Sequence, residues 1–134
     1  MTVEEYEAEA LQDLQIDVTK LEDCAKILGL KKAKWARHLY DEECILAEVE
    51  ERLNELYRDK FHFYLYEFDQ KIEKKSVDVY VKGDPTYKEA EKMYKKQKAK
   101  TRMVEQVIAA LDKQSFSMNI ILKHMAWESG ESAS

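Results

Sequence analysis

The chain has 134 residues, 37% of them charged, and a formal net charge of −5 at pH 7. Three Gly, one Pro and abundant Glu, Lys, Leu and Ala predict long helices with few tight turns. No run of eighteen apolar residues occurs and the N-terminus is acidic, so we expect a soluble protein rather than a membrane-spanning or secreted one. Cys24 and Cys44 lack a CxxC spacing, which favours free thiols in a reducing cytoplasm over a disulfide or zinc site.

The charge is segregated along the chain. Residues 24–40 carry five bases and no acid, and residues 88–102 carry seven bases and two acids, whereas residues 41–55 carry seven acids and one base. An acidic protein with two basic blocks binds a polyanion locally, while its remaining charge limits indiscriminate adhesion. Each block is also compatible with a solvated helix face, and the second with salt bridges to a neighbour's acidic segment.

Two capping patterns open the chain. Thr2-Val3-Glu4-Glu5 predicts a helix through about Gln15. Thr19-Lys20-Leu21-Glu22 repeats the pattern, and Gly29 is expected to end the short helix that follows it. A much longer helix is then predicted from about Lys31.

The long helix carries a heptad seam that is broken by Glu42 and ends at Lys60. Its apolar positions are Trp35, Leu39, Leu46, Val49, Leu53, Leu56 and Phe63. Trp35 and Trp127 occupy apolar helical positions, so we interpret both as core anchors rather than base-stacking residues.

Beyond Leu56 the periodicity changes. Aromatic and apolar residues alternate between 61 and 66, and three valines alternate between 77 and 81, which predicts a small β-hairpin. As a strand from residue 58, the segment would place on one face Arg58, Lys60, His62, Tyr64, Tyr66 and Phe68. As a helix continuing to about Tyr66, it would pair Arg58 with His62 and Lys60 with Tyr64 at four-residue spacing.

The last part of the chain is predicted to be a helical hairpin. Asp84 and Pro85 mark a helix start, Asp112 to Ser115 is expected to form a hinge or tight turn, and a second apolar helix should end at Gly130. The apolar faces exceed what two helices bury, so we expect self-association. The candidate oligomerisation residues are Tyr94, Val104, Ile108, Leu111, Phe116, Ile120 and Trp127.

Six of the fourteen aromatic residues lie between Tyr57 and Phe68, beside two cations. Rings stack on bases at about 1–3 kcal/mol per base, and cations neutralise phosphates. This mixture suits single-stranded nucleic acid, although an aromatic core segment with two solvated charges is the alternative. The candidate nucleic-acid-binding residues are Arg58, Lys60, His62 and Tyr64, together with Lys31, Lys32, Lys34 and Arg37 in the first basic block.

Sequence motifs for catalysis are missing. There is no Gly-rich phosphate loop, nucleophile elbow or recognised metal-binding motif. His38 with Asp41, Glu42 and Cys44 lacks any ligand spacing, so we interpret it as helix surface, and an enzyme built on it is disfavoured. We therefore expect a non-enzyme without a cofactor or metal.

Three short motifs resemble those of a known family. They are Ile16-Asp17-Val18-Thr19-Lys20-Leu21 with a following Lys34-Trp35 pair, residues 57–64, and the stretch from Phe116-Ser117-Met118 to Trp127-Glu128-Ser129-Gly130. They are similar to motifs of the UvsY recombination mediators of T-even-like phages. The resemblance aligns the family's single-stranded DNA (ssDNA)-binding Leu-Lys-Ala-Arg-Leu-Asp-Tyr-Tyr with residues 57–64, so its two functional cations fall on Arg58 and Lys60. Residues 65–115 depart most from the family, which has a Gly-rich connection after the Tyr pair.

The resemblance implies a mainly α fold and a ring of six or seven subunits in the cytoplasm of an infected bacterial host. Residues 1–82 would form an ssDNA-binding domain, and residues 83–134 an oligomerising helical hairpin. The protein would contact a UvsX-like recombinase and the phage single-stranded-DNA-binding protein, and would help the recombinase replace that protein on the strand. The alternative is a non-catalytic helical scaffolding or regulatory protein that acts only through protein–protein contacts.

Overall fold

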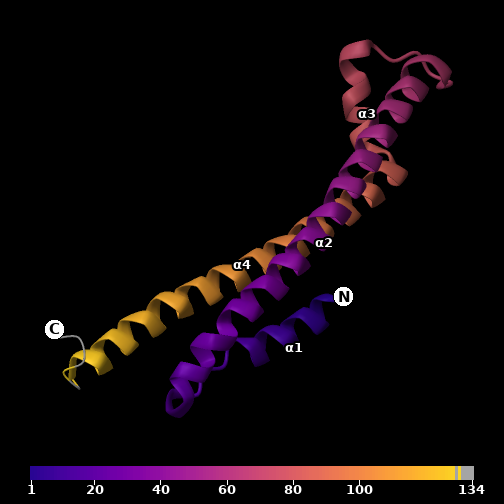
Figure 1. Ribbon diagram of the computed structural model, residues 1–134. Helices are drawn as coiled ribbons and strands as arrows, with labels where there is room; N and C mark the ends of the chain where they lie inside the picture. Colours follow the sequence, from indigo (N-terminus) through magenta and orange to yellow (C-terminus); the bar gives the residue numbers. More distant parts are fainter. Residues whose placement is uncertain (129, 131–134) are drawn as a thin grey trace. The chain divides into compact units, whose positions relative to one another are not determined.

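The computed structural model describes residues 1–128 and 130, and Ser129 of the last motif lies outside them. The described part is mainly helical (Figure 1), and none of its helices is long and apolar enough to cross a membrane. Two compact units are formed, a terminal unit of Met1–Tyr40 with Arg102–Ser134 and a central unit of Asp41–Thr101. The elements are α1 (Val3–Asp13), η1 (Val18–Lys20), α2 (Leu21–His62), the π-helix η2 (Phe63–Glu67), η3 (Lys74–Ser76), α3 (Val77–Gly83) and α4 (Pro85–Glu128).

The terminal unit is built on α1, the first half of α2 and the second half of α4. As predicted, Thr2 caps α1, because its hydroxyl accepts a hydrogen bond from the Glu5 N–H at 3.1 Å. The second predicted cap is wrong, since Asp17 and not Thr19 accepts from the backbone and starts η1. The core consists of Tyr6, Ala10, Leu21, Leu28, Trp35, Val104, Val107, Leu111 and Met118.

The expected stop at Gly29 is wrong, because α2 runs unbroken from Leu21 to His62. Glycine commonly ends a helix by adopting a positive φ, and the φ of Gly29 is not positive. A helical Gly costs only about 1 kcal/mol relative to Ala, and burial of Leu28 and Trp35 on the same helix offsets that cost. Trp35 is completely buried, so its prediction as a core anchor is confirmed.

The central unit has an aromatic core at the end of α2, where Figure 1 shows α3 beside that helix. The predicted β-hairpin is wrong, because residues 61–66 and 77–81 are helical. The helical turn buries Val77 and Val81, which are four residues apart, and leaves Val79 71% exposed. The buried residues are Leu53, Val77, Val81 and Tyr87, against which Tyr57, Phe61, Tyr64, Leu65, Ile72, Ala90 and Tyr94 pack.

A buried polar layer interrupts the apolar packing of the central unit. Glu42 is 2% exposed, and its carboxylate accepts from the Gln97 side chain at 2.9 Å and pairs with Lys100 at 3.1 Å. Thr101 completes the layer by donating to the Gln97 backbone carbonyl at 3.0 Å. Glu42, which interrupts the heptad seam of α2, thus contacts the polar residues Gln97 and Lys100 of α4.

The predicted C-terminal hairpin is also wrong, because α4 continues through Asp112–Ser115 as one helix. That stretch contains no Gly or Pro, and two of its side chains have partners: Asp112 pairs with Lys32 at 3.1 Å, and Gln114 donates to the Leu14 carbonyl at 2.6 Å. The predicted helix start at Asp84 and end near Gly130, which has a φ of 77°, are confirmed.

Candidate nucleic-acid interface

The outer face at the end of α2 combines a cation with exposed rings. Arg58, His62 and Tyr66 are exposed at four-residue spacing, and the His62 and Tyr66 ring centroids lie 5.0 Å apart. Tyr66 is 72% exposed. With Lys74 from η3, these side chains line an open hollow of about 470 Å³ whose remaining walls are Tyr57, Phe61 and Leu65. We call Arg58, His62, Tyr66 and Lys74 the Arg58 surface.

Lys60 and Tyr64 face a different direction and converge on Asp84. The Lys60 Nζ lies 3.4 Å from the Asp84 carboxylate, and the Tyr64 hydroxyl donates to the same oxygen at 2.7 Å. Asp84 also caps α4 by accepting from the N–H groups of Thr86 at 2.9 Å and Tyr87 at 3.3 Å. Of the two arrangements predicted for this segment, strand and helix, the helical one is therefore correct. Arg58 lines the same hollow as His62, and Lys60 and Tyr64 contact the same Asp84 oxygen.

The environment of Asp84 keeps it ionised. Burial by itself would raise its pKa, but the hydrogen bonds from Tyr64 and from the two backbone N–H groups, together with the Lys60 charge, hold the pKa below its ordinary value. The same hydrogen bond raises the pKa of Tyr64. Lys60 thus balances a buried carboxylate, and its charge is less available to a ligand than that of Arg58.

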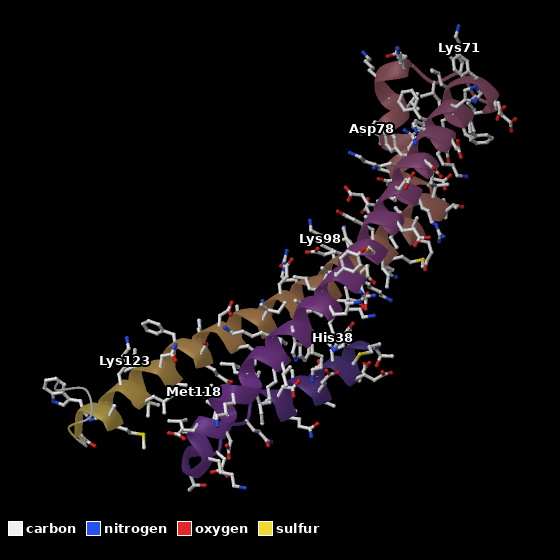
Figure 2. The ribbon with its side chains drawn as sticks, in the orientation of Figure 1. His38, Lys71, Asp78, Lys98, Met118 and Lys123 are labelled. Atoms are coloured by element: carbon white, nitrogen blue, oxygen red, sulfur yellow. The ribbon has the colours of Figure 1, made fainter. Side chains whose placement is uncertain are left out.

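A second hydrogen bond fixes α3 against α2. The Tyr57 hydroxyl donates to Asp78, which is labelled in Figure 2, and this bond with partial burial raises the pKa of Tyr57 to about 12. Tyr64 packs against Phe68 at a centroid distance of 5.1 Å and against Tyr80 at 5.8 Å. Tyr64, a predicted stacking residue, is therefore half-buried among other rings.

The first basic block is engaged within the terminal unit. Lys34 lies 2.5 Å from Asp13 and 2.9 Å from Glu9, and Lys31 donates to the Asp13 carbonyl at 3.0 Å. Asp13 also accepts from the buried Trp35 Nε1–H at 2.9 Å, and these partners lower its pKa although burial opposes them. The remaining two cations have internal contacts as well, Lys32 with Asp112 and Arg37 with the Tyr40 ring at 5.4 Å.

The predicted oligomerisation residues separate into two groups. Val104 and Leu111 are completely buried, and Ile108 packs against the same core. Tyr94 packs in the central unit. By contrast, the predicted residues near the end of α4 are exposed, namely Phe116 (69%), Ile120 (52%) and Trp127 (69%). The prediction that Trp127 anchors a core is therefore wrong within this chain.

The His38 region is structural. In Figure 2, His38 points from α2 towards α1, where its Nε2 lies 2.9 Å from Glu9 and its ring packs edge-on against Trp35 at 5.1 Å. Glu42 is buried in the polar layer, and Cys44 is exposed. Among the described residues, no group of three His, Cys, Asp or Glu side chains could hold a metal ion.

Comparison with known families decides the affiliation of this fold. Residues 9–131 match the model of the family described as "Recombination, repair and ssDNA binding protein UvsY". The chain belongs to the UvsY family. Solved structures similar to it include three crystal forms of the bacteriophage T4 recombination mediator protein UvsY. No curated protein matches the sequence significantly.

The likeness to T4 UvsY extends over nearly the whole fold at low sequence identity. Lattice type II aligns with a TM-score of 0.85 and 17% identity over 96% of this chain and 98% of T4 UvsY. Lattice type IV gives 0.83 and 16% over 96% and 99%, and lattice type I gives 0.79 and 16% over 91% and 97%. The helical architecture is therefore that of UvsY.

Arg58 and His62 are among the binding residues predicted from the sequence, whereas Tyr66 and Lys74 are not. The four-residue spacing of positions 58, 62 and 66 is visible in the sequence. It places Tyr66 beside His62 only if the segment is helical. Lys74 had no comparable pattern, because it reaches the hollow from a separate 3-10 turn.

Proposed function

We propose that this UvsY-family chain binds ssDNA through the Arg58 surface and acts as a recombination mediator. The observation that carries the proposal is the convergence of Arg58, Lys74 and two exposed rings on one open hollow. The description of the family as ssDNA-binding and of T4 UvsY as a recombination mediator supports it. The alternative of a scaffold acting only through protein contacts gives no role to the two cations of this surface.

The two kinds of side chain on this surface have separate tasks. Arg58 and Lys74 contact phosphates, whose charge they neutralise as counterions are released. His62 and Tyr66 offer ring faces on which bases stack without regard to sequence. Lys60 and Tyr64 act indirectly, because their contacts with Asp84 fix the helix end that presents the surface.

The test replaces Arg58 with Ala and measures oligo-dT binding at several salt concentrations. Loss of one phosphate contact should lower the slope of log K against log salt by about 0.7. Arg52→Ala is the matched control, since Arg52 lies on the same helix, is 74% exposed and contacts only Glu48 among the described residues. An unchanged slope for Arg58→Ala, or an equal fall for Arg52→Ala, would remove Arg58 from the interface.

We further propose that copies of the chain associate through the outward face of Phe116, Ile120 and Trp127, giving the hexamer or heptamer of the family resemblance. On a helix these three positions share one side, opposite the inward Met118 and the other core residues of α4. Apolar area of this kind is costly in water. Repetition of a weak site around an assembly would raise affinity for one long strand by about 10²-fold or more.

Phe116→Ser with Trp127→Ser tests the association face, with sedimentation of the full chain as the measurement. We expect a smaller species that retains helical content and loses affinity for long but not short oligonucleotides. Val79→Ser is the control, because Val79 is similarly exposed at 71% on α3. A pair of serines that leaves the assembly intact would contradict the proposed face.

The final step of the proposed function is loading of a UvsX-like recombinase onto strands covered by single-stranded-DNA-binding protein. The chain would hold the strand while the two proteins exchange. Release of a labelled binding protein from oligo-dT, followed with recombinase alone and with the chain added, measures this step. Addition of the chain should speed release, and Arg58→Ala should reduce the gain. Equal rates with and without the chain would refute the mediator role.

A further inference from the structure

The outer face of α4 in the central unit carries a row of lysines that the Arg58 surface does not use. Lys88, Lys92, Lys95, Lys96 and Lys98 are exposed, whereas Tyr87, Ala90, Tyr94 and Gln97 form the packed face of the same helix. Lys98, labelled in Figure 2, projects outward from α4. We call these five residues the α4 lysine row.

Most of this charge is uncompensated. Lys95 pairs with Glu91 at 3.1 Å, and the Lys98 Nζ lies 6.0 Å from the Tyr94 ring centroid. Lys88, Lys92 and Lys96 have no ion pair or hydrogen bond from their side chains to any described residue. An open hollow of about 480 Å³ runs along the row and is lined by Pro85, Lys88, Glu89, Glu91, Lys92 and Lys95.

The arrangement is unfavourable for the helix itself. Lys88, Lys92 and Lys96 follow one another at four-residue spacing, where like charges repel. The first turn of α4 ends at Lys88 and contains no acidic residue, and the N-cap Asp84 before it is already paired with Lys60, although the positive end of a helix favours negative charge. A row that opposes helix stability, and in which Lys88, Lys92 and Lys96 lack internal partners, is suited to an external anion.

The composition of the row distinguishes between kinds of partner. Protein interfaces are enriched in aromatic residues and Arg and depleted of Lys, but all five cations here are Lys and no outward ring accompanies them. Lysine provides a point charge for phosphates without selecting a sequence. From Lys88 to Lys98 the helix rises about 15 Å, which corresponds to about four phosphates of a stacked strand at 3.4 Å each.

We propose that the α4 lysine row is a second ssDNA contact that binds the phosphodiester backbone only. This inference rests on the proposed function, because it assigns a further part of the same strand to this chain. The Arg58 surface holds bases and phosphates, whereas the lysine row adds electrostatic affinity without stacking.

The experiment uses the full chain with Lys88, Lys92 and Lys96 all changed to Gln, and measures oligo-dT binding against salt. The slope of log K against log salt should fall by about 2, and affinity at 0.1 M salt should fall about 100-fold, as three lost contacts require. The melting temperature should not decrease, since repulsion is removed. The charge-retaining K88R, K92R and K96R triple variant should bind like the original chain.

A matched triple variant controls for net charge. Lys20, Lys26 and Lys113 are also exposed and lack an ion pair in the described part of the chain, so their change to Gln should leave the slope nearly unaltered. An unchanged slope in the lysine-row variant, or an equal change in the control, would overturn the proposal. Reduced self-association with an unchanged slope would assign the row to a protein partner and also overturn it.

Failure of this proposal is separable from failure of the proposed function. If Arg58→Ala weakens binding and the lysine-row variant does not, the lysine row is refuted and the Arg58 surface stands. If only the lysine-row variant weakens binding, the second contact stands and the Arg58 surface is wrong.

Discussion

The first basic block lies on α2 and the Arg58 surface begins at the end of the same helix, yet their cations have different surroundings. Lys31 and Lys34 contact Asp13, a residue that also accepts a hydrogen bond from the indole of the core residue Trp35. Arg58 is exposed beside two rings. We therefore infer that a cation of this chain is available to a ligand only where the fold supplies no acid to neutralise it.

The largest effect expected from this comparison comes from Asp13. Asp13→Ala should lower the free energy of unfolding by about 2–4 kcal/mol, because it leaves the buried Trp35 N–H without its acceptor and removes one of the two acids that pair with Lys34. Denaturant unfolding of the full chain provides the measurement. Asp112→Ala removes an exposed ion pair with Lys32 and should cost less than about 1 kcal/mol. Equal costs would contradict the structural role of Asp13.

At the end of α2, replacement of Lys60 should mainly change stability, whereas replacement of Arg58 should mainly change DNA binding. Lys60→Met keeps the aliphatic stem but removes a partner of buried Asp84, so stability should fall by about 1 kcal/mol with a smaller change in salt slope than Arg58→Met causes. Arg58→Met should leave stability within about 0.5 kcal/mol and lower the slope by about 0.7. Thermal melts and oligo-dT titrations of both variants decide the matter, and a larger slope change for Lys60 would reverse the assignment.

Acidification provides a third test, through Asp84. The pKa of Asp84 is depressed in the folded state, so the unfolded state binds the proton more readily. The stability that the Asp84 charge contributes is therefore complete above the ordinary pKa of 3.8 and is lost as pH falls through the folded pKa. Asp84→Asn preserves capping but not charge. It should cost about 1 kcal/mol at pH 7, and that difference should shrink below about pH 4. A difference that stays constant down to pH 3 would exclude the charge as its cause.

The smallest effect is expected at Lys32, a predicted DNA contact in the first block. Lys32→Gln should change stability by less than about 1 kcal/mol, because its pair with Asp112 is largely exposed, and should leave the salt slope of ssDNA binding unaltered. A fall of about 0.7 in the slope would show that this cation contacts phosphate. That result would contradict the distinction between the first basic block and the Arg58 surface.

The helical seams were predictable because their spacing is local information. Trp35 and Leu53 are buried where the heptad placed them, and Asp84 caps α4 as its position before Pro85 indicates. Gly29 and Asp112–Ser115 misled because helix continuity there depends on tertiary packing and on distant partners such as Leu14 and Lys32.

The candidate interface was predictable only in part. Alternating aromatic residues fit a strand, and what decides for a helix is the burial of Val77 and Val81 against residues of α2. The division of the cations into structural and exposed ones depends on ion pairs between residues more than twenty positions apart, such as Lys34–Asp13 and Lys60–Asp84. A sequence read alone contains no information on which acid meets which base.

The polar layer around Glu42 has a consequence for how this sequence can drift over generations. Replacing Gln97 or Lys100 alone leaves a buried carboxylate under-compensated, which is costly, whereas exchanging Glu42 and its partners together for well-packed apolar side chains is often neutral or better. A single substitution in this layer should therefore lower stability. A related sequence without the layer would need several of these positions changed together.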